Sequence, residues 1–168
     1  MERGLTQRLL AVKLLVLDVD GVMTDGRIFK SESGEEILAF HVKDGMAITR
    51  LKDEGIEPAV LSGRASGALM ARAKELGIEK LHLGKKNKAE AVRIIARETG
   101  TDIEAVAFVG DDLLDIGAMK LVGLAVAVAD AADEVKEIAH LVLKTPGGKG
   151  AVREIAEKIL KAKGRWIT

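Results

Sequence analysis

Short, continuous apolar runs alternate along this chain with longer segments in which apolar residues recur at helical spacing. The first run, Leu14 to Leu17, contains no polar residue, which is typical of a parallel strand buried on both faces. We expect strands at 13–18, 58–64, 80–83, 105–112, 124–128 and 141–143. We expect helices at 46–56, 66–78, 87–100, 113–121, 131–139 and 149–163, and a short helix or a loose lead-in at 2–11.

This alternation of strands and helices with short links predicts an α/β fold: a doubly wound, Rossmann-like parallel sheet with helices on both faces. Residues 27–40 have the pattern of two short strands around the turn Ser33-Gly34, so we expect a small β-hairpin insertion at about 26–41. We see no internal repeat, no linker and no room for a cap domain. The sequence therefore predicts a single domain over residues 1–168.

Composition narrows the classes of partner. Lysine plus arginine and aspartate plus glutamate number 26 each, so charge gives no reason to expect a nucleic acid or a membrane surface. The chain has no cysteine, which excludes a disulfide framework, a thiolate metal site and a cysteine nucleophile. No apolar run approaches the length of a membrane span, and the first residues lack the apolar core of a signal peptide. We therefore expect a cytoplasmic protein.

Polar side chains follow the predicted strands at the points where these strands end. The set comprises Asp18, Asp20, Ser62, Lys85, Lys86, Lys88, Asp111, Asp112 and Asp115. Because the carboxyl ends of parallel strands open on one edge of a sheet, these side chains can converge. Carboxylates, a hydroxyl and an ammonium are the groups that phosphoryl transfer uses, and carboxylates at a strand end suit Mg²⁺.

Each of these pieces also has a plain structural interpretation. Asp18 and Asp20 would share a face on a continuing strand, where their charges repel each other unless a cation lies between them, but they also fit an acidic turn. Ser62 fits an ordinary turn, and Asp112 and Asp115 fit the first turn of a helix, where the helix dipole favours acids. Their common placement at strand ends favours the functional interpretation.

Four segments resemble the four motifs of the haloacid dehalogenase-like phosphatases: DVDG at 18–21, Ser62 in LSGR, Lys88, and GDDLLD at 110–115. Beyond these motifs, LDVDGVMTDG, the FHVKDG of 40–45, ARAKELGI, VGLAVAVADA and GGKGAVREI resemble the 3-deoxy-D-manno-octulosonate 8-phosphate phosphatase family, an uncapped group of that superfamily. The likeness covers nearly the whole chain.

The resemblance implies a mechanism. Asp18 would attack phosphorus and form an aspartyl-phosphate. Asp20 would protonate the leaving alkoxide and then activate the hydrolytic water. Ser62 and Lys88 would bind phosphoryl oxygens. Mg²⁺ would be held by Asp18, the Asp20 backbone carbonyl and Asp111, with Asp112 or Asp115 in support.

The resemblance also implies the partners. The substrate would be a phosphorylated sugar acid, contacted by Asp20, His41, Val42, Lys43, Asp44, Gly45, Arg64, Arg72 and Lys88. The hairpins of this family assemble a homotetramer in which a neighbouring subunit closes the uncapped site. The apolar hairpin residues fit such burial, although they can also pack on their own domain; they are Ile28, Phe29, Ile37, Leu38 and Phe40.

Three positions depart from the family's pattern. Lys43, Thr49 and Lys149 stand where the family often has arginine, and lysine cannot make arginine's forked contact. The sequence also ends at Thr168, soon after the last predicted helix, so we expect the family's tail contribution to a neighbouring site to be shortened or absent. These departures concern the substrate rather than the phosphatase core.

The alternatives differ in substrate or in class. A phosphatase of the same mechanism could act on another sugar phosphate, such as a nonulosonate 9-phosphate. A phospho-acceptor signalling domain also uses strand-end acids, a hydroxyl and a lysine, but it places the phosphorylated aspartate on a later strand. A scaffold that kept only the fold is the third alternative, and the intact set of polar side chains argues against it.

Overall fold

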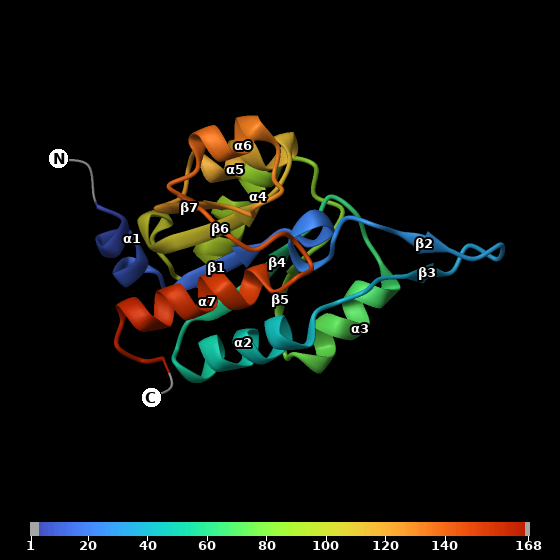
Figure 1. The fold of residues 1–168 in the computed structure, drawn as a ribbon, viewed down its shortest axis with the longest axis horizontal. Helices are drawn as coiled ribbons and strands as arrows, with labels where there is room; N and C mark the ends of the chain where they lie inside the picture. The colour runs from blue at the N-terminus through green and yellow to red at the C-terminus, as the bar shows by residue number, and fades with distance from the viewer. Residues whose placement is uncertain (1–3, 167–168) are drawn as a thin grey trace.

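A computed structural model describes residues 4–166. Six parallel strands form one sheet in the order β5-β4-β1-β6-β7-β8 (Figure 1). The strands are β1 (Leu14–Leu17), β4 (Glu57–Leu61), β5 (Lys80–His82), β6 (Val106–Gly110), β7 (Leu124–Ala127) and β8 (Leu141–Val142). The predicted α/β fold with a parallel sheet is confirmed.

The strand order explains where a site can form. From β1 the chain winds outward through β4 to β5, then returns to β6 on the other side of β1 and winds outward to β8. The direction of winding therefore reverses between β1 and β6, and open α/β sheets bind ligands at the carboxyl ends of such strands. Leu17 lies opposite Val60 and Val109, so neighbouring strands end almost level.

Helices cover both faces of the sheet (Figure 1). Helix α7 packs against α2 and α1 on one face, while α4, α5 and α6 lie on the other. The helical elements are α1 (Leu5–Ala11), α2 (Val42–Asp53), α3 (Gly67–Glu75), α4 (Lys88–Glu98), α5 (Ile116–Met119), α6 (Asp133–Ile138), α7 (Ala151–Ala162), and the short turns η1 (Val19–Met23), η2 (Ile103–Ala105) and η3 (Leu113–Asp115). No helix within residues 4–166 is both long enough and apolar enough to cross a bilayer.

Helix α2 begins at Val42, four residues before the predicted start at 46, so that boundary was wrong. The His41 side chain caps the helix by accepting a hydrogen bond from the Lys43 backbone N–H. Asp44, in the first turn, is buried and accepts a hydrogen bond from the Arg153 backbone N–H at 2.8 Å. Asp44 thereby caps α7, whose own N-cap residue, Gly150, has no side chain to do so.

The helix predicted at 113–121 was too long. An Asp112–Asp115 capping box starts the turn η3, and the α-helical part spans only four residues, Ile116–Met119. The box draws both carboxyl groups onto the backbone at the end of β6. This local geometry shapes the site described below.

The predicted hairpin projects from the body of the molecule as β2 (Phe29–Lys30) and β3 (Glu36–Ile37) (Figure 1). Two of its apolar residues pack on their own domain, and two others do not. Leu38 and Phe40 pack against the protein's own core, whereas Phe29 and Ile37 are 51% and 64% exposed. Phe29 and Ile37 are paired across the ribbon, so they share one face. The described residues contain no cap domain.

Candidate active site

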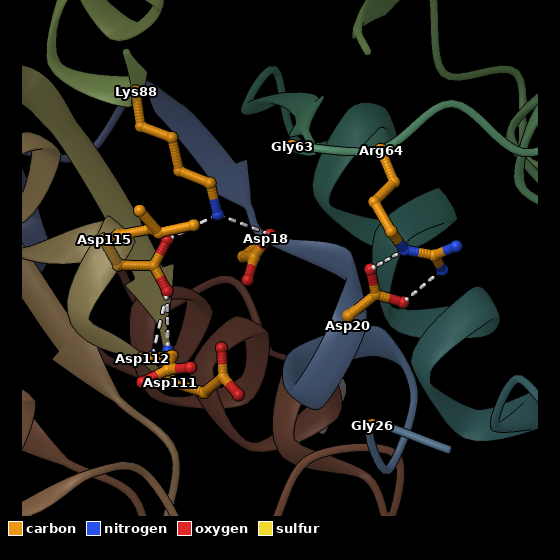
Figure 2. A pocket seen from close by; sticks show the side chains of 10 residues that line it. Asp18, Asp20, Gly26, Gly63, Arg64, Lys88, Asp111, Asp112 and Asp115 are labelled. Carbon is orange, nitrogen blue, oxygen red and sulfur yellow. Dashed lines mark hydrogen bonds and ion pairs between the residues drawn. The ribbon is translucent and has the colours of Figure 1, made fainter. Parts of the chain in front are cut away.

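A cavity of about 340 Å³ opens at the carboxyl ends of β1 and β6, and Figure 2 shows it from close by. This volume lies within the range of small-molecule sites, roughly 300–1,000 Å³. The lining residues are Asp18, Asp20, Gly26, Gly63, Arg64, Lys88, Asp111, Asp112, Leu114 and Asp115. The structure therefore brings together most of the strand-end groups that the sequence places at this edge.

Asp18 and Asp20 point in different directions. Strand β1 ends at Leu17, and the chain then enters the distorted turn η1, so the shared face expected for a continuing strand does not exist. Within this turn Gly21 adopts φ +86°. A Cβ atom there would lie 1.8 Å from Oδ2 of Asp111, so only glycine lets the turn approach that carboxylate.

Lys88 forms a buried ion cluster with two carboxylates. Its Nζ lies 2.7 Å from Oδ1 of Asp18 and 2.6 Å from Oδ1 of Asp115, and all three side chains are at most 8% exposed. The other Asp115 oxygen accepts hydrogen bonds from the backbone N–H groups of Asp111 and Asp112. Asp115 thus joins the start of α4 to the end of β6 and holds Lys88 beside Asp18.

Burial and neighbouring charges shift the pKa values of these groups. Burial, followed by the charge of Asp115, raises the pKa of Asp18 to about 6. Burial, followed by the charge of Asp18, raises the pKa of Asp111 to about 8. Burial alone would lower the pKa of Lys88, but the charges of Asp18 and Asp115 outweigh burial and raise it, so Lys88 is a cation at neutral pH.

The carboxylates fit a divalent cation. One oxygen from each of Asp18, Asp111 and Asp115 lies within 4.8 Å of the other two. Hard oxygen ligands of this kind suit Mg²⁺, and a cation there would relieve the repulsion that raises the two carboxyl pKa values. Asp115 already binds Lys88 and the backbone, so Asp18 and Asp111 have the freer oxygens.

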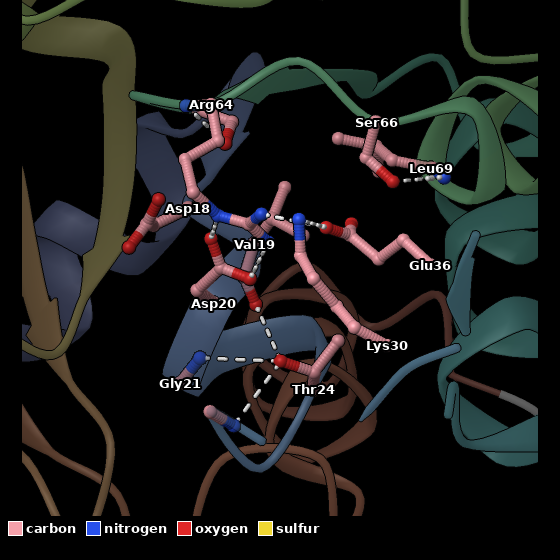
Figure 3. A network of polar contacts seen from close by, with 12 residues as sticks. Asp18, Val19, Asp20, Gly21, Thr24, Lys30, Glu36, Arg64, Ser66 and Leu69 are labelled. Carbon is pink, nitrogen blue, oxygen red and sulfur yellow. Dashed lines mark hydrogen bonds and ion pairs between the residues drawn. The ribbon is translucent and has the colours of Figure 1, made fainter. Parts of the chain in front are cut away.

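Asp20 lies on the other side of the cavity, in a network with Arg64 and Glu36 (Figure 3). The Arg64 Nε and Nη2 atoms donate to the two Asp20 oxygens, each at 2.9 Å. Arg64 Nη1 donates to Oε2 of Glu36, also at 2.9 Å. Sequence reasoning missed Glu36, because nothing in the pattern around residue 36 marks a contact with residue 64.

Of the remaining candidates, which follow the second and third predicted strands, some line the cavity and others do not. Ser62 is buried behind the lining, and its hydroxyl oxygen accepts a hydrogen bond from the Arg64 backbone N–H at 3.2 Å. Lys85 and Lys86 are exposed and do not line the cavity, whereas Lys88 does. The predicted N-cap of α4 is confirmed, since the Asn87 side chain accepts from the Glu90 N–H, and this cap sets the start of the helix that carries Lys88.

The segment His41–Gly45 and Arg72 do not line this cavity in the described chain. His41, Asp44, Gly45 and Arg72 instead line a separate, small space that Phe40 also lines. Gly45 allows the close approach of Arg72, because a Cβ atom at Gly45 would overlap the Arg72 guanidinium. The substrate contacts that the resemblance implies therefore fall into two groups within one chain.

The segment Gly147–Gly150 packs against the turn η1 and the residues that follow it. The Gly148 N–H donates to the Val22 carbonyl, and a Cβ atom at Gly147 would lie 1.8 Å from the Gly21 carbonyl oxygen. The two adjacent glycines before α7 were the sequence signal for a close backbone approach. Which segment they approach, residues 21–25, depends on the fold.

The fold and these strand-end groups define a class of protein. The sequence model of the haloacid dehalogenase-like hydrolase family matches residues 80–155, which carry Lys88 and the acids after β6. The 3-deoxy-D-manno-octulosonate 8-phosphate phosphatase KdsC of Haemophilus influenzae is 44% identical over 159 residues, which cover 95% of this chain and 88% of the relative.

Solved structures of proteins from the same family have the same fold as this chain. The phosphatase of the same description from Yersinia pestis superposes with a TM-score of 0.94 at 42% identity, over 95% of this chain and 86% of that one. The one from Moraxella catarrhalis, in complex with a magnesium ion, a phosphate ion and KDO, gives a TM-score of 0.91 at 36% identity, over 94% and 90%. The chain belongs to the 3-deoxy-D-manno-octulosonate 8-phosphate phosphatase family, as its motifs predict.

Proposed function

We propose that this protein is a Mg²⁺-dependent phosphatase that hydrolyses 3-deoxy-D-manno-octulosonate 8-phosphate through an aspartyl-phosphate. One observation carries the proposal: in a member of this family, a buried lysine holds Asp18 beside a second carboxylate, Asp111, at the switch point of the sheet. The Moraxella catarrhalis relative, solved with magnesium, phosphate and KDO, supports the same substrate and cation for this chain.

The first half of the reaction transfers the phosphoryl group to the protein. An oxygen of Asp18 attacks phosphorus in line, the Asp18 O–P bond forms, and the bond from phosphorus to the sugar oxygen breaks. Asp20, in its protonated form and held by Arg64 through its other oxygen, gives its proton to the departing sugar oxygen. Lys88 orients Asp18 and neutralises charge on the phosphoryl oxygens, and the Ser62 hydroxyl has a proton to donate to one of them.

The second half releases phosphate. Asp20, now ionised, accepts a proton from water as the water oxygen attacks phosphorus, and the Asp18 carboxylate is regenerated. Asp18, the Asp20 backbone carbonyl and Asp111 would hold Mg²⁺, with Asp115 in support. When bound, the cation supplies charge neutralisation for these carboxylates and for the phosphoryl oxygens.

We also propose that the protein works as a homotetramer in which a neighbouring subunit closes the site. Two features support this. Phe29 and Ile37 share an exposed face of the hairpin, which exposes apolar area that assembly would bury. In addition, His41–Gly45 and Arg72 lie apart from the cavity of their own chain, as expected if they served another subunit. The single domain and the cytoplasmic location stay predictions.

The test is phosphate release with Mg²⁺ across a panel of sugar phosphates, run beside Asp18→Asn. We expect strong preference for the eight-carbon sugar-acid phosphate and a loss of at least about 10⁴-fold in the variant, because the nucleophile is removed. Asp53→Asn, at the far end of α2, is the matched control with wild-type activity. Preference for a nonulosonate 9-phosphate would change the substrate and keep the mechanism. Hydrolysis that persists in Asp18→Asn would reject the mechanism.

A further inference from the structure

Glu36 connects the projecting hairpin to the proposed acid–base residue. It lies on β3 and its side chain is 15% exposed, although most of the hairpin around it is open to solvent. Its Oε2 accepts from Arg64 Nη1 at 2.9 Å, while the nearest other cation, Lys30, is 4.0 Å away and 62% exposed (Figure 3). Arg64 is therefore its main charged partner.

The contact determines the orientation of Arg64. A guanidinium is a rigid plane, so a bond to Nη1 also orients the edge formed by Nε and Nη2. That edge holds both oxygens of Asp20. Without Glu36, the half-exposed Arg64 side chain could rotate about its long stem, and Asp20 would follow or lose a bond. The hydrogen bonds to Asp20 and Glu36 use three of the five N–H groups of Arg64, so two remain for a ligand.

We infer that Glu36 is a positioning residue: through Arg64 it holds the Asp20 carboxyl group where it can protonate the leaving oxygen. This inference rests on the proposed function and adds to it. Glu36 carries the necessary charge, because hydrogen bonds from Arg64 and then Ser66 lower the pKa of its carboxyl group. It follows that the position of the hairpin, and any assembly built on it, affects the leaving-group side of the site.

The test uses a series of substituted phenyl phosphates that differ in the basicity of the phenol and carry no carboxylate. A weakly basic phenol departs without a proton, whereas a more basic one needs the general acid, so loss of acid positioning steepens the decline of kcat/KM along the series. A structural fault at Asp18 or the cation site would instead lower all substrates alike. The ratio kcat/KM is used because it reports the steps up to departure of the leaving group.

We expect Glu36→Ala to leave kcat/KM for p-nitrophenyl phosphate within about twofold and to lower it about tenfold for the most basic phenol, part of the roughly 10²–10⁴-fold that a general acid supplies. Glu36→Gln keeps an acceptor oxygen for Arg64 and should fall between wild type and alanine. Glu35→Gln, on the exposed neighbour, is the matched control and should behave as wild type. Unchanged melting temperatures would confirm that the variants fold.

The coupling through Arg64 has its own test. In an Arg64→Ala background, Glu36→Ala should steepen the series no further, because the link to Asp20 is already broken. A wild-type slope in active Glu36 variants, or an equal further effect in the Arg64→Ala background, would overturn this inference alone. If Asp18→Asn hydrolyses phosphate esters as fast as the wild-type protein does, the proposed function is overturned, and this inference with it.

Discussion

The two sides of the cavity are built differently. On the phosphoryl side, Lys88, Asp18 and Asp115 are at most 8% exposed and are tied to strand and helix ends. On the leaving-group side, Asp20 and Arg64 are 30% and 36% exposed, and their support comes from a projecting two-stranded hairpin. The difference teaches that, in the proposed mechanism, charge stabilisation is preorganised by the core, whereas proton transfer depends on a more exposed support.

Among these variants, Lys88→Met should cause the largest loss, because it removes the cation of the buried phosphoryl side. It leaves the Asp18 and Asp115 carboxylates buried without their cation, so we expect a loss of about 3 kcal/mol or more in the free energy of unfolding. Activity should fall about 10²–10³-fold, because a donor to the transferred group is lost. Urea unfolding and phosphate release measure the two effects. Lys86→Met, on the exposed neighbour, should change neither; wild-type stability in Lys88→Met would contradict the buried ion cluster.

Asp20→Asn tests the exposed leaving-group side. It should lower the rate of phosphate release and leave the free energy of unfolding nearly unchanged. We expect phosphate release to slow by about 10²–10⁴-fold, the usual contribution of a general acid and base. The free energy of unfolding should change by less than about 1 kcal/mol, because an exposed ion pair contributes little and asparagine still accepts from Arg64. An unchanged rate would remove Asp20 from the proposed mechanism.

The stability of the cation-free protein should depend on pH through the buried side. The carboxyl pKa values of Asp18 and Asp111 are raised to about 6 and about 8. Stability from these groups is therefore present at low pH and lost as pH rises through those values. Mg²⁺ needs the ionised carboxylates, so it should stabilise the protein more at pH 8.5 than at pH 5.5. At pH 8.5, Mg²⁺ at 100 times its dissociation constant should add about 2.7 kcal/mol to the free energy of unfolding.

Thermal unfolding with and without Mg²⁺ at the two pH values measures this difference. Asp111→Asn should reduce the stabilisation by Mg²⁺. Equal stabilisation at both pH values in the wild-type protein would place the cation elsewhere.

The smallest effect on the fold is expected at the hairpin. Phe29→Asp combined with Ile37→Asp should convert the proposed tetramer to monomers in sedimentation velocity and raise KM for the sugar phosphate, with circular dichroism unchanged. In the single chain each substitution should cost no more than about 0.5 kcal/mol, because both side chains are exposed. Ser33→Asp adds charge in the same hairpin and should leave the assembly intact. A wild-type protein that sediments as a monomer would contradict the proposed assembly.

Local patterns predicted those helices and strands well whose limits depend only on neighbouring residues in the sequence. The run Leu14–Leu17, which has no polar residue, predicted a buried strand, and Asn87 marked the start of α4 because a cap needs only its own turn. The boundary of α2 was wrong because His41 caps the helix before its apolar residues begin to repeat, and the polar Asp44 of its first turn is buried against Arg153, which is far away in sequence. The helix after β6 was too long because two acids closed a tighter turn first.

The sequence by itself determined the fold class, the family and the chemical groups at the strand ends, since these follow from periodicity, short-range caps and motifs. Only the tertiary structure decided how the groups divide: Asp18 toward Lys88 and Asp20 toward Arg64, although they are two residues apart. It also decided that Glu36 contacts Arg64 and that His41–Gly45 do not line the cavity. The physical reason is that an ion pair depends on the distance between two side chains in space. The strand-end pattern predicts which groups converge on one edge of the sheet, but not which of them form a pair.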